Sequence, residues 1–173
     1  RYDTSVPPNL DSFRLRWFVK YEPGELKVVA YDKDGEAAEE QIVRTADYES
    51  QLLLEPDVKT LKADGDDLCY ITVSMLDKDG NFCADSDDEV LVTIEGAARF
   101  RAICNGDPTS LELFTEPHMR LFHGKLVVTI QSTEKPDDIK VTVIRPSGNY
   151  KDSKGKKFSQ NLIENSVTIK SVK

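Results

Sequence analysis

The strongest constraint on the fold is an alternation of apolar and polar residues that recurs along the chain with a period of two. In LCYITVSML, residues 68–76, every second residue from Cys69 to Met75 is apolar, and the residues between them are Tyr, Thr and Ser. Successive side chains of a strand point to opposite faces, so this pattern predicts a strand with one buried face. Turn-forming Gly, Pro, Asn and Asp interrupt such segments about every ten residues, which is typical of a β-sandwich. The predicted fold class is all-β.

The strand candidates fall into two groups on either side of a polar segment at residues 45–51. The first group has three candidates, at residues 13–21, 25–32 and 39–46. Three strands are too few for a closed sandwich, so we interpret this group as the remnant of a larger one. The second group has about the seven strands of an immunoglobulin-like domain, at residues 52–56, 59–63, 68–76, 89–96, 98–105, 124–132 and 138–146. We predict a partial β-sandwich at 1–47, an immunoglobulin-like β-sandwich at 48–148, and a basic tail at 149–173 with one late strand, SVTIKSV.

Charge is unevenly distributed along the 173 residues, whose formal net charge is −8. Residues 146–173 contain six lysines against Asp152 and Glu164, a balance of +4, so the remainder carries −12. An acidic body is repelled by nucleic acid and by anionic membranes. No apolar run approaches the roughly 20 residues that cross a bilayer. We expect neither nucleic-acid binding nor membrane insertion, and we expect a chain that begins with Arg1 and has no apolar leader to be part of a longer polypeptide.

The tetrapeptide DKDG occurs twice, at residues 32–35 and 77–80, each time after an apolar run. A calcium loop needs oxygen ligands at fixed positions, and the second copy places Met75 and Ser86 at two of them. An Asp-Gly pair between extended segments is instead a hairpin signal, because glycine adopts positive φ at no steric cost. The pattern favours a tight turn in both copies.

A separate acidic run, ADSDDE at residues 84–89, admits two interpretations. Its four carboxylates, together with those of ADGDD at residues 63–67, could surround a cation. Alternatively, its like charges keep a loop extended and solvated, which is the favoured interpretation. We assign no metal site.

The three cysteines, Cys69, Cys83 and Cys104, are odd in number and have no CxxC spacing. This excludes a disulfide-stapled scaffold and gives zinc no paired ligands. Cys69 lies on the apolar side of its strand, so we expect a buried free thiol there. A disulfide between two of the three cysteines remains an alternative if the parent protein is exported.

His118 and His123 are the two histidines of the chain and the candidates for a general base. Both lie in EPHMRLFHGK, which we interpret as a loop leading into a strand. The chain has no GxSxG elbow, phosphate-binding glycine loop or HExxH motif. Surface histidines are the favoured interpretation, and no catalytic or cofactor-binding residue is assigned. We expect this chain to catalyse nothing by itself.

Phe18 interrupts the polar face of the predicted strand at 13–21, where Arg14, Arg16 and Lys20 alternate. An aromatic side chain at such a position would be exposed to water, so we predict that Phe18 packs against a neighbouring domain. Trp17 shares the opposite face with apolar neighbours, and core packing is favoured over sugar stacking there.

The order of the motifs from residue 13 to residue 146 resembles the end of the fourth domain and the immunoglobulin-like fifth domain of β-galactosidase-like glycoside hydrolases of family 2. The first stretch, RLRWFVKYEPGELKVVAYDKDGEAAEEQIVRTA, is similar to the family pattern W-x-V-x-Y-x-P-G-x-L-x-A-x-A-Y, followed by a D/N-G turn and TAG. Val28 stands where alanine is common, and Asp47 replaces the usual glycine. The matching residues are Trp17, Val19, Tyr21, Pro23, Gly24, Leu26, Ala30, Tyr31, Gly35, Thr45 and Ala46.

The resemblance continues in LKADGDDLCYITVSMLDKDGNF, in ICNGDPTSLELF and in RLFHGKLVVTIQS, which are similar to the start, the GNGDPTS loop and a late strand of the fifth domain. Cys104 stands where glycine is usual. The residues themselves predict a structural turn at Asn105, Gly106 and Asp107. In such a turn the Asn and Asp side chains accept hydrogen bonds from backbone amides. We infer no ligand there.

The resemblance implies a parent enzyme that hydrolyses β-linked galactosides or related glycans with two glutamates on a (β/α)₈ barrel. Such a barrel needs about 250 residues, so the catalytic residues would lie elsewhere. The main hypothesis is a non-catalytic region that contacts the catalytic and neighbouring domains, braces the barrel and shapes substrate access or oligomer contacts. The alternative is an independent carbohydrate-binding module, with Phe100, Phe114, Phe122 and Tyr150 as candidate stacking residues. The resemblance also implies a periplasmic or extracellular parent.

Overall fold

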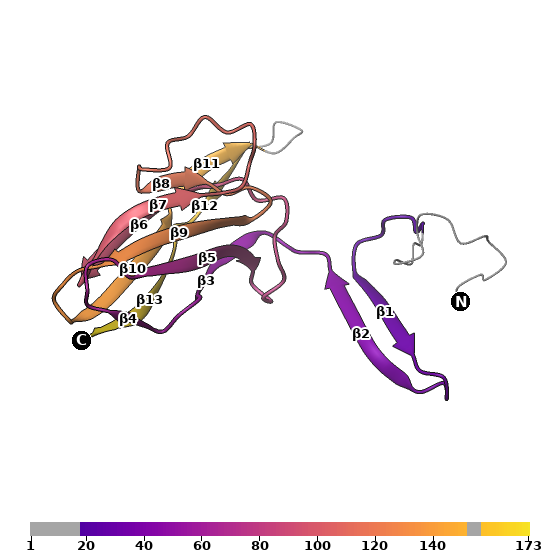
Figure 1. Ribbon diagram of the computed structural model, residues 1–173. Helices are drawn as coiled ribbons and strands as arrows, with labels where there is room; N and C mark the ends of the chain where they lie inside the picture. The colour runs from indigo at the N-terminus through magenta and orange to yellow at the C-terminus, as the bar shows by residue number, and fades with distance from the viewer. Residues whose placement is uncertain (1–17, 152–156) are drawn as a thin grey trace. The chain divides into compact units, whose positions relative to one another are not determined.

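The computed structural model describes residues 18–151 and 157–173, and the chain divides into two compact units at Thr45 and Ala46. Unit 1 ends at Thr45 and unit 2 comprises Ala46–Lys173. The described residues form strands, turns and bends, which confirms the all-β prediction (Figure 1). Among them there is no helix that is long and apolar enough to span a membrane.

The described part of unit 1 contains an antiparallel hairpin, formed by β1 (Glu25–Tyr31) and β2 (Ala37–Arg44). One face carries two ion pairs, Arg44 Nη2 to Glu25 Oε2 at 2.8 Å and Lys27 Nζ to Glu40 Oε2 at 2.6 Å. The other face presents Leu26 opposite Val43, and both side chains are exposed. A two-stranded sheet with an uncovered apolar face is marginally stable in water by itself.

The strand predicted at residues 13–21 differs from the observed structure. Residues 18–21 are not in a strand, and residues 13–17 lie outside the described part of the chain. Phe18, Val19 and Tyr21 are exposed. Alternation identifies a face that can be buried, but a strand also needs a layer that buries it, and the described hairpin does not provide one.

Unit 2 is a β-sandwich of two sheets (Figure 1). Sheet 1 has the order β3 (Glu49–Pro56), β5 (Leu68–Asp77), β9 (Lys125–Ser132) and β7 (Ala98–Cys104). Sheet 2 has the order β4 (Thr60–Lys62), β13 (Ile163–Val172), β10 (Asp138–Arg145), β6 (Glu89–Gly96) and β8 (His118–Arg120). The order in sheet 1 corresponds to strands A, B, E and D of an immunoglobulin domain, and β6, β10 and β13 correspond to C, F and G.

The core lies between the two sheets and follows the predicted alternation. In β5, Cys69, Ile71, Val73 and Met75 are fully buried, as the period of two predicts. Sheet 2 contributes the matching row from Ile139 to Val143 on β10. Burying one aliphatic side chain of this size contributes roughly 1.5–3 kcal/mol, so these rows hold the two sheets together.

The segment after residue 148 belongs to unit 2 and is not a separate tail. The link from β10 to β13 extends into a two-stranded ribbon of β11 (Gly148–Lys151) and β12 (Lys157–Gln160). Strand β13 then pairs antiparallel with β10 and parallel with β4, which places it inside sheet 2. Ile163, Ile169 and Ser171 of this strand are buried and Val167 is half-buried, whereas Asn165 is exposed. The lysine-rich stretch therefore contains a strand of the sandwich.

Both DKDG segments form tight turns, which confirms the turn interpretation. In each, the first aspartate accepts two peptide N–H groups: Asp32 Oδ1 from Asp34 and Glu36, and Asp77 Oδ1 from Asp79 and Asn81. The positive φ falls on the glycines, at 85° for Gly35 and 81° for Gly80. The same four residues therefore close a hairpin in both units.

Candidate functional site

The acidic run at residues 84–89 separates into three environments instead of forming one cluster. Asp85 and Asp87 line a pocket at one end of the sandwich, Asp88 faces the buried Arg145, and Glu89 lies on β6 beside His118. Within residues 18–151 and 157–173 there is no group of three or more His, Cys, Asp or Glu residues arranged to hold a metal ion.

Asp88 and Arg145 form an ion pair in the interior of unit 2. Arg145 Nε lies 3.3 Å from Asp88 Oδ2, and the Arg145 side chain is only 1% exposed. Burial raises the pKa of the Asp88 carboxyl, and the Arg145 guanidinium partly opposes that shift. Arg145 occupies the next inward-facing position of β10 after Val143, which places its side chain in the interior.

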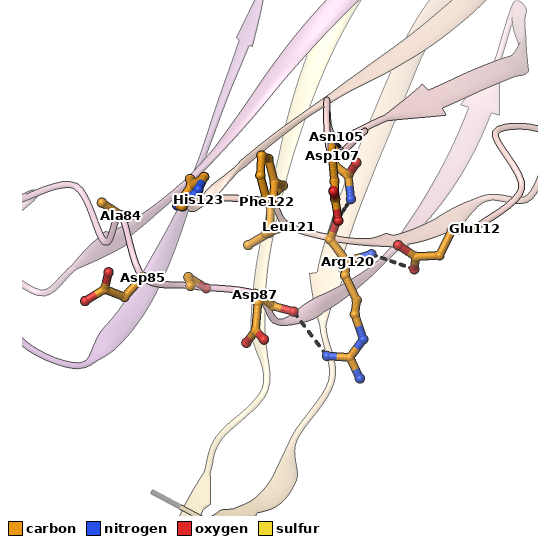
Figure 2. A pocket seen from close by; sticks show the side chains of 11 residues that line it. Ala84, Asp85, Asp87, Asn105, Asp107, Glu112, Arg120, Leu121, Phe122 and His123 are labelled. Atoms are coloured by element: carbon orange, nitrogen blue, oxygen red, sulfur yellow. Dashed lines mark hydrogen bonds between the residues drawn. The ribbon is translucent and has the colours of Figure 1, made fainter. Parts of the chain in front are cut away.

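The pocket lies among the loop at residues 84–87, the loop at residues 105–112, and the turn that follows β8 (Figure 2). Its volume is about 400 Å³. The lining residues are Ala84, Asp85, Ser86, Asp87, Asn105, Asp107, Glu112, Arg120, Leu121, Phe122 and His123. Several of these residues belong to motifs recognised in the sequence, but nothing in the sequence pointed to Glu112 or Arg120.

Arg120 connects the walls of the pocket through hydrogen bonds to three residues in the loops at 84–87 and 105–112 (Figure 2). Its backbone N–H donates to Glu112 Oε1 at 3.0 Å, and its carbonyl accepts from Asn105 Nδ2 at 3.0 Å. Its guanidinium Nη1 donates to the Asp87 carbonyl at 3.2 Å. These bonds join the segments that form the pocket walls.

The turn at residues 105–107 forms one wall of the pocket. Asn105 Oδ1 accepts the peptide N–H of Asp107 at 3.0 Å, and Gly106 has a φ of 80°. Asp107 Oδ1 accepts the peptide N–H of Thr109 at 2.8 Å and its hydroxyl at 2.7 Å. These bonds from Thr109 lower the pKa of the Asp107 carboxyl.

The loop after this turn reverses the usual orientation of polar and apolar side chains. Ser110 and Glu112 face inward, where the Ser110 hydroxyl donates to Glu112 Oε2 at 3.2 Å. Leu111 and Leu113 face outward and are 96% and 65% exposed, and Phe114 is 53% exposed. The backbone of the loop is nevertheless held in place at Phe114, because the Ile103 N–H donates to the Phe114 carbonyl at 2.9 Å.

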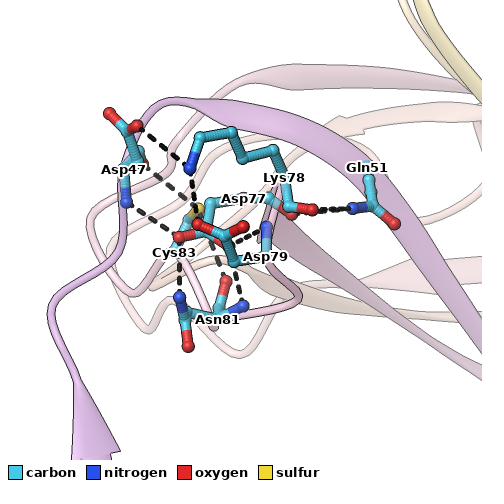
Figure 3. Close-up of polar contacts among 7 residues, drawn as sticks. All are labelled: Asp47, Gln51, Asp77, Lys78, Asp79, Asn81 and Cys83. Carbon is cyan, nitrogen blue, oxygen red and sulfur yellow. Dashed lines mark hydrogen bonds and ion pairs between the residues drawn. The ribbon is translucent and has the colours of Figure 1, made fainter.

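Asp77 is the centre of a second polar cluster, at the start of unit 2 (Figure 3). The side chain is 1% exposed, and Oδ2 accepts the peptide N–H of Asp47 at 2.9 Å and Asn81 Nδ2 at 3.0 Å. Together with the two bonds of the turn, the carboxylate accepts four hydrogen bonds. The bond from Asp47, followed by those from Asn81 and Asp79, holds the pKa of Asp77 well below its usual range.

The two histidines have different surroundings. His118 is the first residue of β8, which corrects the loop expected there, and its Nδ1 lies 3.2 Å from Glu89 Oε1 at the surface. Strand β8 forms because its short segment pairs with the edge of β6, a long-range contact that local sequence does not reveal. His123 lies at the pocket and contacts Phe122, with ring centroids 4.3 Å apart.

The remaining aromatic candidates have different environments. Phe100 is half-buried against the core, and Phe18 in unit 1 is 97% exposed. The interface role of Phe18 stays a prediction. The side chain of Tyr150 and all of Trp17 lie outside the described structure.

We expect one cysteine of three to react with a thiol reagent in the folded chain. All three are free; Cys104 is exposed, whereas Cys69 and Cys83 are buried. Burial raises the pKa of Cys69 to about 12 and that of Cys83 to about 11, so neither forms the reactive thiolate near neutral pH. Ellman's reagent should therefore titrate one thiol before unfolding and three in urea. Cys104→Ser should remove the fast reaction, and a fast reaction that persists in this variant would contradict the assignment.

The fold defines the chain as an immunoglobulin-like β-sandwich protein with a polar pocket at one end of the sandwich. The family model described as glycoside hydrolase family 2 C-terminal domain 5 matches residues 52–151. The chain therefore belongs to glycoside hydrolase family 2. A second model, a domain of unknown function called DUF4982, matches residues 3–39.

Three relatives illustrate the relationship. The β-galactosidase BoGH2A of Bacteroides ovatus is 40% identical over 134 residues, which are 78% of this chain and 16% of that protein. The structure of a glycosyl hydrolase family 2 member from Bacteroides cellulosilyticus is 26% identical with a TM-score of 0.76, over 91% of this chain and 18% of that one. A β-glycosidase structure from Bacteroides vulgatus is also 26% identical with a TM-score of 0.76, over 89% and 18%. The chain thus spans less than a fifth of the length of each of these relatives.

Proposed function

We propose that the chain is the non-catalytic C-terminal β-sandwich region of a larger family 2 enzyme that hydrolyses β-galactosides. The relative with 40% identity is named a β-galactosidase, and the chain corresponds to 16% of its length. In this proposal the catalytic glutamates belong to another domain, and the sandwich contacts the catalytic and neighbouring domains.

The main structural support for this proposal is the loop at residues 110–114. This loop exposes three apolar side chains to solvent, those of Leu111, Leu113 and Phe114. Its polar side chains make hydrogen bonds on the inner side of the loop. Exposed apolar side chains that are grouped and fixed in position are typical of interaction surfaces. A second surface, on unit 1, supports the same role, because Leu26 and Val43 are exposed on one face of the hairpin.

The test compares the complete enzyme with the isolated 173-residue chain. Leu111→Ser with Leu113→Ser should lower the Tm of the complete enzyme by several degrees, roughly 3–8 °C, because buried interface contacts are lost. In the isolated chain the same pair should change the Tm by about 1 °C or less, because both side chains are already exposed. Differential scanning calorimetry of both proteins gives the comparison.

Leu162→Ser is the matched control, because Leu162 is another exposed leucine outside this loop. Equal shifts in the complete enzyme and in the isolated chain would rule out a domain contact at the loop. The isolated chain should also fail to cleave a chromogenic β-galactoside, and cleavage by it would overturn the non-catalytic assignment.

A further inference from the structure

The turn at residues 105–107 contains an asparagine followed directly by a glycine, a pair that occurs once in the chain. Such a pair can react with itself, because the backbone nitrogen of the second residue can attack the side-chain amide of the first and close a five-membered ring. Glycine favours this attack, since it has no Cβ and the greatest backbone freedom. Whether the pair reacts depends on how the fold presents its two groups.

The attacking group, the backbone nitrogen of Gly106, is unobstructed. Gly106 is exposed, and a Cβ added at this position would meet nothing within 4 Å. Its N–H makes no hydrogen bond to any residue of 18–151 or 157–173. An exposed N–H without a partner in the protein is open to water and to hydroxide, which removes its proton as the nitrogen attacks.

The group under attack, the side-chain amide of Asn105, is held in one orientation by two hydrogen bonds (Figure 2). Its Oδ1 accepts the peptide N–H of Asp107, and its Nδ2 donates to the Arg120 carbonyl, both at 3.0 Å. A donor on Oδ1 polarises the amide and stabilises the negative charge that develops on this oxygen when Cγ is attacked. The folded turn therefore combines a free nucleophile with an activated amide.

We propose that Asn105 is a modification site, at which the folded chain deamidates in water without an enzyme. The Gly106 nitrogen forms a bond to Cγ of Asn105, and the bond between Cγ and Nδ2 breaks. Nδ2 leaves as ammonia with the proton of the Gly106 N–H, and a succinimide ring remains. Water then opens this ring. Its addition at Cγ gives aspartate, whereas its addition at the main-chain carbonyl gives isoaspartate.

The product changes the loop that Asn105 ties to Arg120. In aspartate an oxygen takes the place of Nδ2, so that two acceptors face each other and the bond to the Arg120 carbonyl is lost. The new charge also joins the carboxylates that line the same pocket, those of Asp85, Asp87, Asp107 and Glu112. Deamidation should therefore loosen the loop at residues 105–114. Weakening of a domain contact by this change rests on the proposed function.

The experiment is mass spectrometry of the folded 173-residue chain, aged at mildly alkaline pH and then digested with trypsin. The tryptic peptide of residues 102–120 contains Asn105 as its one asparagine and has no glutamine, so the mass gained when NH₂ is replaced by OH identifies the site. The peptide of residues 79–99 contains Asn81 alone, followed by Phe82, and is the internal control. Asn105 should be converted about tenfold faster than Asn81, because glycine follows it.

An unaged sample digested in parallel corrects for conversion during digestion. Equal rates at Asn105 and Asn81 would overturn the proposal. Conversion of Asn105 only after unfolding in urea would overturn it as well, because the turn would then protect the side chain instead of presenting it.

The variant Asn105→Asp reproduces one product and tests its effect on the loop. The amides of Ile103 and Arg120, which donate to Phe114 and Glu112 of this loop, should exchange with deuterium about tenfold faster in the variant. Asn105→Ser is the matched control, because a neutral hydroxyl can still accept the Asp107 N–H, and it should accelerate exchange about threefold or less. Unchanged exchange in Asn105→Asp would contradict the effect on the loop.

These measurements use the isolated chain and do not depend on a domain contact. The contact itself is tested with Leu111 and Leu113 in the complete enzyme, so failure of one proposal leaves the other standing.

Discussion

Arg145→Met should lower the free energy of unfolding of unit 2 by about 3–5 kcal/mol, because it leaves the carboxylate of Asp88 buried without its charged partner. The Arg145 side chain is 1% exposed and its Nε lies 3.3 Å from Asp88 Oδ2, so water cannot readily replace it. Burial already raises the pKa of Asp88, and loss of the guanidinium removes the effect that opposes this rise. Urea unfolding, followed by circular dichroism at pH 7, measures the difference.

The double variant Arg145→Met with Asp88→Leu separates charge from packing. A buried ion pair replaced by apolar side chains of similar volume often costs little, so the double variant should recover most of the lost stability. The interaction free energy between the two sites follows from the four proteins of the cycle. Loss of stability in the double variant equal to the sum of the single losses would show that the two residues act independently.

Asp77→Asn should lower the Tm of unit 2 by roughly 5–10 °C. The amide oxygen can still accept the peptide N–H groups of Asp79 and Asn81, as Oδ1 does now. The amide nitrogen, however, would replace Oδ2 and point donor to donor at the Asp47 N–H and at Asn81 Nδ2. Asp32→Asn is the matched control within the same tetrapeptide, because Asp32 is exposed and uses only Oδ1. It should change the Tm by about 2 °C or less.

The Asp77 cluster also predicts how stability depends on pH. The pKa of Asp77 is lowered in the folded state, chiefly by the bond from Asp47, so the ionised carboxylate stabilises the fold. That contribution is present above the ordinary carboxyl pKa of about 4 and is lost as the pH falls below it. Asp64 and Asp107 are shifted in the same direction. Thermal melts between pH 6 and pH 3 should therefore show a steeper loss for the original chain than for Asp77→Asn, and parallel curves would contradict this role.

Much of the fold was predictable because most sandwich strands carry their own apolar alternation. The alternation in β5, β6, β9 and β10 identified both the strands and the sides that face the core. The two DKDG turns were recognisable because glycine at positive φ is a local requirement. The short strand β8 was missed because its pairing partner on β6 lies far away in the sequence. The ribbon β11–β12 was missed because its segments, GNYK and KFSQ, are short and have no apolar alternation.

The pocket was not predictable for a related reason. Asp87, Asn105, Glu112 and Arg120 come from three separate segments, and only folding brings them together. Sequence showed that residues 84–89 are acidic, but it did not show that neighbouring acids in this run face different surroundings. Asp88 lies beside Arg145 in the interior, while Asp87 lines the pocket.

The position of β13 has a consequence for how the sandwich is made in the cell. This strand, Ile163–Val172, lies between β4 and β10, and Asn165 Nδ2 donates to the Leu52 carbonyl at 2.7 Å, across 113 residues of sequence. Contacts between residues so far apart in the sequence form slowly during folding. In a nascent chain, the backbone groups of β4 and β10 that pair with β13 therefore stay unpaired until residues 163–172 emerge from the ribosome. Products of premature translation termination would expose β10 along its whole length, and chaperones and proteases would recognise them by that open edge.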